Sequence, residues 1–522
     1  MMNSLSYVTR FILLLWLCTS LPASSSAQEV SIPDPGLNAA VRAALHKSSG
    51  PLTSEDLLSL TNLNASRASV KSIAGLEAAR NLASLQLQIN LLTNLSLPGA
   101  LAQLRFLDLG SNPLTNLFLP DSLTNLTSLV LDSAGLATLA LPPGLTTLTN
   151  LDLENNNLTN LALLSNLTRL VSLNLGFNLF AQFSLPAGLT NLSTFYFAGN
   201  PLVSVVLPPG LAGMTDLNLS QNLLTSFALP TGMSNLEELD LAFNQLTNLT
   251  LPGDLFNLAE LELDFNQLTR LELPPNLNRL SSLHLRANLF ANFNLTTELP
   301  ALAFLDVSES PLSSFTLSVH LNQLTSLRLS KNRLTNFTLP AGLTNLAGLN
   351  LSNNSLTNVV LPPDLSHLDT LLLSGNQLAG ITLPSGLTHL AGLFLTANEL
   401  TTITLPPDLT ELVALGFLSN PLTTVILPET LAATNLADTV ASLVSQGVSV
   451  FTYPLTTQLV HPRLLTGVFQ FELTGPPGIY TVESGDLVTW NVLAPATNRL
   501  GSVSFRDTPS SPQKFYRATR HP

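Results

Sequence analysis

The sequence predicts a right-handed repeat solenoid with a parallel β-sheet on its concave face, a helical N-terminal cap and a small antiparallel β domain at its C-terminal end. Three observations lead to this prediction. A pattern of hydrophobic residues recurs every 22 residues from Asn90 to Asn420 without an insertion. Within each period, leucine alternates with other residues, which places side chains on opposite sides of a short strand. Charged residues make up only 10% of the 522 residues.

Residues 1–27 have the pattern of a secretory signal peptide. Arg10 precedes an apolar run that ends at Cys18, and small residues complete a cleavage site. The apolar run is shorter than the ~20 residues that a membrane-spanning helix needs, which argues against the alternative of a signal anchor. The other alternative, a lipoprotein, would carry a small residue in place of Leu17. We therefore expect a protein that is secreted or held in the cell envelope and has no transmembrane segment after cleavage.

Residues 28–81 predict a helical cap followed by one degenerate coil. The segment 37–45 is an amphipathic helix, and Thr53 offers an N-cap for a second helix that begins before Leu57. Apolar residues between 60 and 76 fit the 22-residue phase imperfectly. Such a cap covers the apolar end that the first full coil would otherwise expose.

Residues 82–433 divide into 16 coils of 22 residues with the pattern L-x-x-L-x-L-x-x-N-x-L-T-x-L-x-L-P-x-x-L. The Asn is replaced only by Ala134 and Ser310. It stands where the chain leaves the strand, so we expect its amide to pair with backbone groups of the turn. The second alternating segment, usually ended by Leu-Pro, predicts short strands or extended turns on the convex side instead of helices.

This pattern is the leucine-rich repeat signature. From about residue 32 to 455 the chain resembles secreted bacterial leucine-rich repeat proteins, including the internalin-like group, whose coils are also 22 residues long and whose N-terminal cap is also helical. The segment L-x-L-P-x-G-L is similar to the plant extracellular type. Those eukaryotic relatives usually have cysteine-stapled caps, and the single cysteine of this chain is Cys18. The resemblance therefore implies a bacterial protein that uses its concave face for recognition.

Two segments follow the array. Residues 434–460 predict a helix and a strand that cap the end of the solenoid. In residues 461–522 the period is lost, and about five short strands separated by Gly, Pro and Ser predict a small β-sandwich-like module. We interpret Tyr480, Trp490 and Phe515 as core residues of this module; the alternative is a carbohydrate-binding surface.

Charged residues gather on the exposed side of the predicted parallel sheet. Neighbouring strands lie ~4.8 Å apart, so Glu238 stands beside Glu260, an arrangement of like charges that lowers stability. We hypothesise a recognition patch for a cationic partner; the alternative is a solvated surface that salt screens. The residues of this charged patch are Glu238, Asp240, Glu260, Glu262, Asp264, His284, Arg286, Asp306 and Arg328.

Composition and motifs restrict the function further. The chain has 20 Lys and Arg against 33 Asp and Glu, so we expect no nucleic-acid partner. It lacks the phosphate-binding, metalloprotease and nucleophile-elbow motifs, and we expect no enzyme activity and no cofactor. Oxygen ligands would suit a divalent cation, but no loop spacing supports a metal site, and we predict none. The residues considered for it are Glu262, Asp264, His284 and Asp306.

The sequence leaves three functions open. The first is a binding or adhesion module, monomeric, whose concave face recognises a protein or glycan. The second is a passive structural component of an envelope or matrix, in which the solenoid is a spacer. The third is carbohydrate binding by the C-terminal module.

Overall fold

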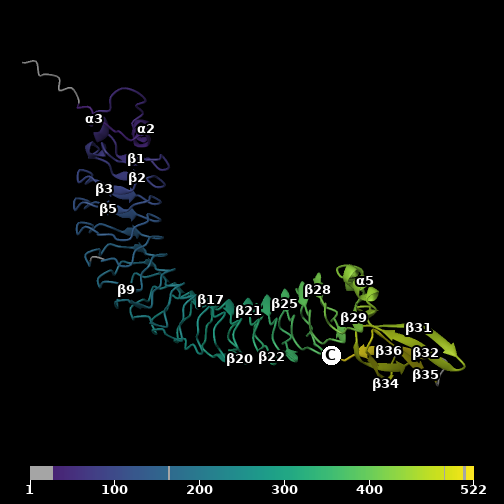
Figure 1. Cartoon of the computed structure of the whole chain (residues 1–522). Coiled ribbons are helices and arrows are strands. Elements are labelled where there is room, and N and C mark those ends of the chain that lie inside the picture. The colour runs from purple at the N-terminus through teal and green to yellow at the C-terminus, as the bar shows by residue number, and fades with distance from the viewer. Residues whose placement is uncertain (1–27, 163–164, 487, 510–512, 522) are drawn as a thin grey trace, which may run out of the picture. The chain divides into compact units, whose positions relative to one another are not determined.

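The computed structural model describes residues 28–162, 165–486, 488–509 and 513–521, so the expected signal peptide lies outside the described residues. The chain divides into two compact units, Met1–Met214 and Thr215–Pro522. Each unit consists largely of leucine-rich coils, and Figure 1 shows their short strands stacked side by side. In the part of the chain that is described, no helix is both long enough and apolar enough to cross a membrane.

The first unit begins with the expected helical cap. Helix α2 (Pro35–Ala44) begins after Asp34, whose carboxylate accepts the N–H of Leu37 at 3.0 Å and the N–H of Lys71 at 2.7 Å. One aspartate therefore caps the helix and joins it to the first coil. The apolar face of α2 is buried, as an amphipathic pattern requires.

The second cap helix, α3 (Ser54–Leu58), begins with a capping box. The hydroxyl of Thr53 accepts the N–H of Asp56 at 3.2 Å, and the carboxylate of Asp56 accepts the N–H of Thr53 at 2.7 Å. The ammonium of Lys47 lies 2.6 Å from the same carboxylate. These contacts lower the pKa of Asp56 to about 2, the hydrogen bond from Lys47 being the largest cause.

The parallel sheet of each unit pairs every residue with the residue 22 positions further along the chain. Asn62 pairs with Ser84 in the first unit, so the degenerate first coil is in phase with the array. Repeat period and sheet register are therefore the same quantity, and equivalent residues stack in columns. In the first unit the sheet strands are β1 (Asn62–Asn64), β2 (Ser84–Gln86), β4 (Phe106–Asp108), β6 (Ser128–Val130), β7 (Asn150–Asp152), β8 (Ser172–Asn174) and β10 (Thr194–Tyr196).

The second unit continues the same pattern. Its leucines point into the coils and are buried, and the residues on either side of them face outward. The sheet strands are β12 (Asp216–Asn218), β14 (Glu238–Asp240), β16 (Glu260–Glu262), β17 (Ser282–His284), β19 (Phe304–Asp306), β21 (Ser326–Arg328), β23 (Gly348–Asn350), β25 (Thr370–Leu372), β26 (Gly392–Phe394) and β28 (Ala414–Gly416). We call the exposed side of this parallel sheet the sheet face.

The other side of the coils carries short strands and turns, as the alternation predicts. The strand pairs are β3 (Asn94–Ser96) with β5 (Asn116–Phe118) and β9 (Gln182–Ser184) with β11 (Ser204–Val206) in the first unit. In the second unit they are β13 (Ser226–Ala228) with β15 (Asn248–Thr250), β18 (Asn292–Leu295) with β20 (Ser314–Leu317) and β22 (Asn336–Thr338) with β24 (Asn358–Val360).

The repeated Asn side chains join neighbouring coils. Asn288, for example, accepts the N–H of Leu268 at 3.0 Å and donates to the carbonyls of Leu263 and Leu285 at 2.9 and 3.0 Å. One buried amide thus pairs backbone groups that no strand would pair. At Ala134 the backbone carbonyl takes over part of this role and accepts the N–H of Leu114 at 2.9 Å.

The residue just before the Asn position has a left-handed backbone in all sixteen coils. Two coils have glycine there, Gly199 (φ 68°) and Gly375 (φ 70°), whereas the others carry side chains as large as Phe243 (φ 54°). Only glycine adopts this conformation without a steric penalty. The sequence analysis did not anticipate it, because the residue type at this position varies freely.

The C-terminal end of the solenoid is capped by two helices and a strand. Helices α4 (Glu429–Ala433) and α5 (Ala437–Ser445) follow the last coil, and β30 (Ser449–Tyr453) joins β29 (Thr424–Pro428), which in turn pairs with β27 (Thr402–Thr404). The buried Tyr453 hydroxyl donates to the carbonyl of Leu405 at 2.6 Å. This bond satisfies the polar end of an aromatic side chain that covers the coil end.

The C-terminal module consists of two three-stranded antiparallel sheets. One has the order β31 (Gln458–Leu465), β32 (Val468–Thr474), β35 (Ser502–Asp507), and the other β34 (Trp490–Asn498), β33 (Gly478–Gly485), β36 (Phe515–Arg520). The sequence analysis missed β31, because most of its residues are exposed and show no alternation.

Only part of the interpretation of the aromatic residues of the module was right. Tyr480 is buried in the core, as expected. Trp490 is half-buried and carries the guanidinium of Arg517 over its ring at 4.2 Å. Phe515 is 43% exposed, so its placement in the core was wrong. The next residue, Tyr516, packs against the core, and alternation along the strand turns Phe515 outward.

Candidate binding site on the sheet face

The charged patch of the sequence analysis lies on five consecutive strands of the second unit. Strands β14, β16, β17, β19 and β21 pair in this order. Glu238 is in register with Glu260, and Asp240 is in register with Glu262. The expected juxtaposition of like charges is therefore present, although the proposal that the patch binds a partner needs its own test.

The acidic side of the patch lines a depression of about 390 Å³. Glu238, Asp240, Glu260 and Glu262 contribute to it, together with neutral groups from β12 and the loop after β14. Its rim carries Phe243, which is 51% exposed and stacks on Phe265 with 4.4 Å between ring centroids. We call this depression the acidic pocket.

Burial and mutual repulsion shift the titration of these carboxyl groups. Burial, followed by repulsion from Asp264, Glu260 and Asp240, raises the pKa of Glu262 to about 8. The pKa of Asp264 rises to about 6, with burial again the largest cause. Burial also raises the pKa of Asp240. The patch therefore takes up protons near neutral pH instead of holding its full negative charge.

His284 forms the boundary of the acidic side. Its Nε2 lies 3.2 Å from Oε1 of Glu262, and its ring stacks on Phe304 with 4.6 Å between centroids. Burial lowers the pKa of His284. The imidazole is therefore neutral at pH 7 and adds no positive charge to offset the carboxylates.

One group of donors on the sheet face has the spacing of a metal site. Ligand atoms of Glu260, Glu262 and His284 all lie within 4.8 Å of one another. This set differs from the one considered in the sequence analysis, because Asp264 accepts the backbone N–H of Arg286 at 2.7 Å and the buried Asp306 accepts that of Ser308 at 2.8 Å. Such acidic groups are common without an ion, and we assign no metal.

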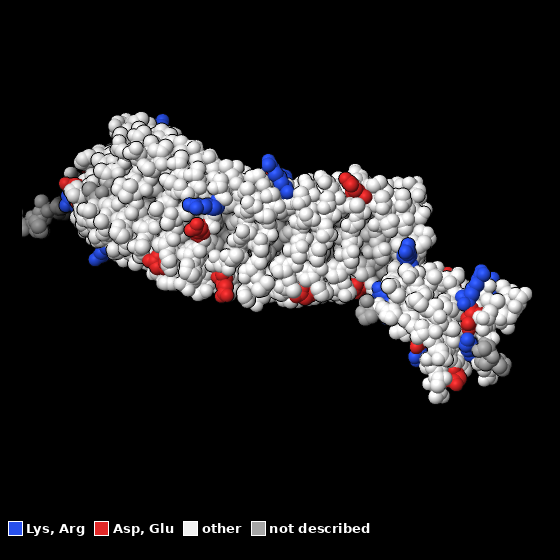
Figure 2. All heavy atoms as spheres, turned by 90° about the horizontal axis from the view of Figure 1, so that it is seen from below, with Lys and Arg blue, Asp and Glu red and all other residues white. Residues whose placement is uncertain are grey.

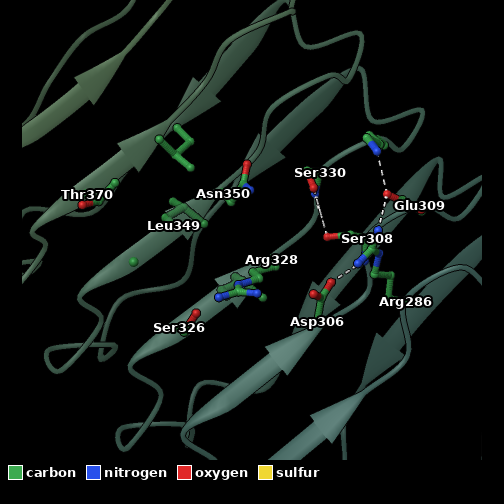
Figure 3. A pocket seen from close by; sticks show the side chains of 14 residues that line it. Arg286, Asp306, Ser308, Glu309, Ser326, Arg328, Ser330, Leu349, Asn350 and Thr370 are labelled. Carbon is green, nitrogen blue, oxygen red and sulfur yellow. Dashed lines mark hydrogen bonds and ion pairs between the residues drawn. The ribbon is translucent and has the colours of Figure 1, made fainter. Parts of the chain in front are cut away.

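The other side of the patch lines a second depression of about 400 Å³, which we call the mixed pocket (Figure 3). The carboxylate of Glu309 lies 2.9 Å from the guanidinium of Arg286 and 2.7 Å from the ammonium of Lys331. Hydroxyl groups of Ser308 and Ser330 are 3.2 Å apart on neighbouring coils. The pocket is thus lined by both signs of charge and by neutral hydrogen-bonding groups.

Two of these charged residues escaped the sequence analysis. Glu309 and Lys331 stand at the left-handed position after the strand, one column beyond those that were read as exposed strand residues. They face the pocket because the chain turns there, and Figure 3 shows Glu309 directed toward Arg286. The 22-residue column that joins them was the available signal.

Charge is distributed differently on another side of the molecule. Figure 2 shows isolated Lys, Arg, Asp and Glu side chains on a largely uncharged surface. In the second unit this view faces the side of the coils that carries β20 and β22. The run of charged residues in consecutive coils is therefore a feature of the sheet face.

Comparison with known proteins identifies the family. Six copies of the profile described as BspA type leucine rich repeat region match residues 88–178, 176–296 and 322–436, more than half of the chain. The chain belongs to this family. Leucine-rich repeat solenoids of this kind are protein-interaction modules, and no catalytic family is indicated for this BspA type protein. No curated protein matches it in sequence.

Several solved structures are similar to this BspA type repeat protein. Toll, solved in its complex with Spätzle from Drosophila, is 24% identical, with 68% of this chain and 52% of that chain covered and a TM-score of 0.52, which shows a shared fold. The internalin InlF of Listeria monocytogenes is 24% identical, with 76% and 99% covered and a TM-score of 0.46. YopM of Yersinia enterocolitica is 25% identical, with 80% and 96% covered and a TM-score of 0.49.

Proposed function

We propose that the protein is a secreted or cell-surface binding module whose acidic pocket on the sheet face recognises a basic segment of a protein partner. The observation that carries this proposal is the row of carboxyl groups in register across β14 and β16. Glu238 opposes Glu260, and the pKa of Glu262 is raised to about 8. Such an arrangement lowers the stability of the free protein, and a partner's cation would relieve it.

The protein's own cations do not neutralise this pocket. Arg286, the nearest arginine in sequence, directs its guanidinium to Glu309 at 2.9 Å. The neighbouring His284 is neutral at pH 7 because burial lowers its pKa. A lysine or arginine of a partner would meet carboxylates at its charged end, and Phe243 at the rim would contact the apolar stem of its side chain.

A charge-reversal pair tests the proposal. The variant Glu260→Lys/Glu262→Lys/Asp264→Lys changes the pocket. The matched control carries the same change in net charge at exposed positions outside both pockets: Glu272→Lys/Glu298→Lys/Glu399→Lys. Binding of a fluorescent oligolysine peptide to the full-length proteins is measured by anisotropy at two salt concentrations.

We expect the pocket variant to lose binding at least tenfold while the control remains close to the parent, because only the former changes the charge beside the peptide. Circular dichroism of each protein shows whether the fold is retained. Equal loss in both variants would mean that only net charge matters. The passive structural role would then be the better account of the protein.

Secretion has a separate test. Cells that express the full chain are divided into cytoplasm, envelope and medium, and the mass of the recovered protein is measured. We expect a product that begins at Gln28, in the medium or the envelope. An intact chain found only in the cytoplasm would contradict this part of the proposal.

A further inference from the structure

The mixed pocket holds an arginine that the protein's own carboxylates leave unpaired. Of its three cations, Arg286 and Lys331 share the carboxylate of Glu309. Arg328 is exposed and forms no ion pair with any residue that the structure describes. Its neighbour in register, Asp306, is buried and accepts the backbone N–H of Ser308 at 2.8 Å.

An aromatic ring positions this arginine at the edge of the pocket. The guanidinium of Arg328 lies over the ring of Phe304, 5.0 Å from its centroid. Phe304 is on β19, between β17 and β21, and its ring also stacks on His284. A guanidinium that stacks on a ring keeps its N–H donors at its edge, where they can meet a planar anion.

The remaining wall of the pocket suits a carboxylate that arrives on a peptide. Ser326, Ser330, Asn350 and Thr370 provide neutral donors, and the volume of about 400 Å³ accommodates a side chain with its backbone. Figure 3 shows Arg328 among these polar side chains, in the row of strands that also carries Asp306. An arginine with both faces of charge recognition available binds a carboxylate through two parallel hydrogen bonds.

We propose that the mixed pocket binds a carboxylate of the same partner segment whose cation occupies the acidic pocket. This inference rests on the proposed function. From β16 to β21 there are three strand steps, and from β14 four, which corresponds to about 14 to 19 Å at ~4.8 Å per step. An extended peptide that crosses the strands spans this distance in about four to six residues at ~3.3 Å each.

Blocked peptides with one lysine test this spacing. The first has an aspartate after four Gly or Ser residues, the second has asparagine in its place, and the third has the aspartate directly after the lysine. A fourth has asparagine and a free C-terminal carboxylate at the long spacing, so that it separates a terminal from a side-chain carboxylate. Their affinities for the full-length protein are measured by isothermal titration calorimetry at low salt.

We expect the long-spaced aspartate peptide to bind about fivefold more tightly than its asparagine counterpart, as for a partly exposed charge pair. Arg328→Gln is expected to abolish this difference and leave the asparagine peptide unchanged. Arg279→Gln, an exposed arginine outside both pockets, serves as the matched control and is expected to retain the difference.

The outcomes separate the inference from the function on which it rests. The inference is overturned if Arg328→Gln retains the difference, or if the adjacent-charge peptide binds as tightly as the long-spaced one. Equal affinity for the aspartate and asparagine peptides also overturns it, but leaves lysine recognition intact. If no lysine peptide binds at millimolar concentration, the proposed function and the inference both fail.

Discussion

Replacing Glu262 with Gln should stabilise the protein in a pH-dependent way. The amide has the same shape and can keep its contact with His284, whose Nε2 is 3.2 Å from the carboxyl. The pKa of Glu262 rises from 4.5 to about 8 on folding. Because the folded pKa is the higher one, the folded state holds the proton between these values, and stability falls as pH rises from 4.5 to 8.

The size of the effect follows from the same shift. Each tenfold change in proton affinity corresponds to ~1.4 kcal/mol, so the rise from 4.5 to about 8 sets an upper limit of about 5 kcal/mol. The side chain of Glu262 is 26% exposed, and water and salt screen part of this interaction. We therefore expect Glu262→Gln to be more stable than the parent by about 2 kcal/mol above pH 8.

Urea unfolding followed by circular dichroism, repeated at intervals from pH 4 to pH 9, measures this difference. At pH 4 both proteins carry a neutral group at position 262, and their free energies of unfolding should agree. Glu272→Gln is the control, because its side chain is 86% exposed and should give a difference that does not vary with pH. A difference for Glu262→Gln that is independent of pH, or that decreases as pH rises, would refute the reasoning.

Three further predictions concern stability. Asn288→Ala leaves three buried backbone groups unpaired and should lower the free energy of unfolding by about 3 kcal/mol, whereas the half-buried Asn420→Ala should cost about 1; equal values in urea unfolding would contradict this. Gly199→Ala should lower the melting temperature, because its Cβ would lie 2.5 Å from the ring of Phe177 and its φ is 68°; an unchanged value in calorimetry would count against it. Asp56→Asn should lose about 1 kcal/mol at pH 7 and nothing at pH 2, since its lowered pKa contributes stability only above about 2; hydrogen exchange of α3 measures this.

The candidate site could be located from the sequence but not described from it. The column of residues between the strand leucines placed Glu238, Asp240 and Glu262 on one face, and the register agrees with that placement. Which charges pair could not be predicted, because partners such as Arg286 and Glu309 come from neighbouring coils and meet through side-chain conformation. That an arginine stays unpaired is decided by the same competition.

The sequence by itself determined the architecture of this protein. A 22-residue period sets the register of the parallel sheet, and the recurrent Asn sets the turn, because both depend on backbone spacing that every coil repeats. Only the tertiary structure decided the left-handed position before each Asn, the outward turn of Phe515 and the place of Arg328 over Phe304. These features depend on contacts between coils or strands, and a pattern read along one chain contains the order of its residues but not which of their side chains touch.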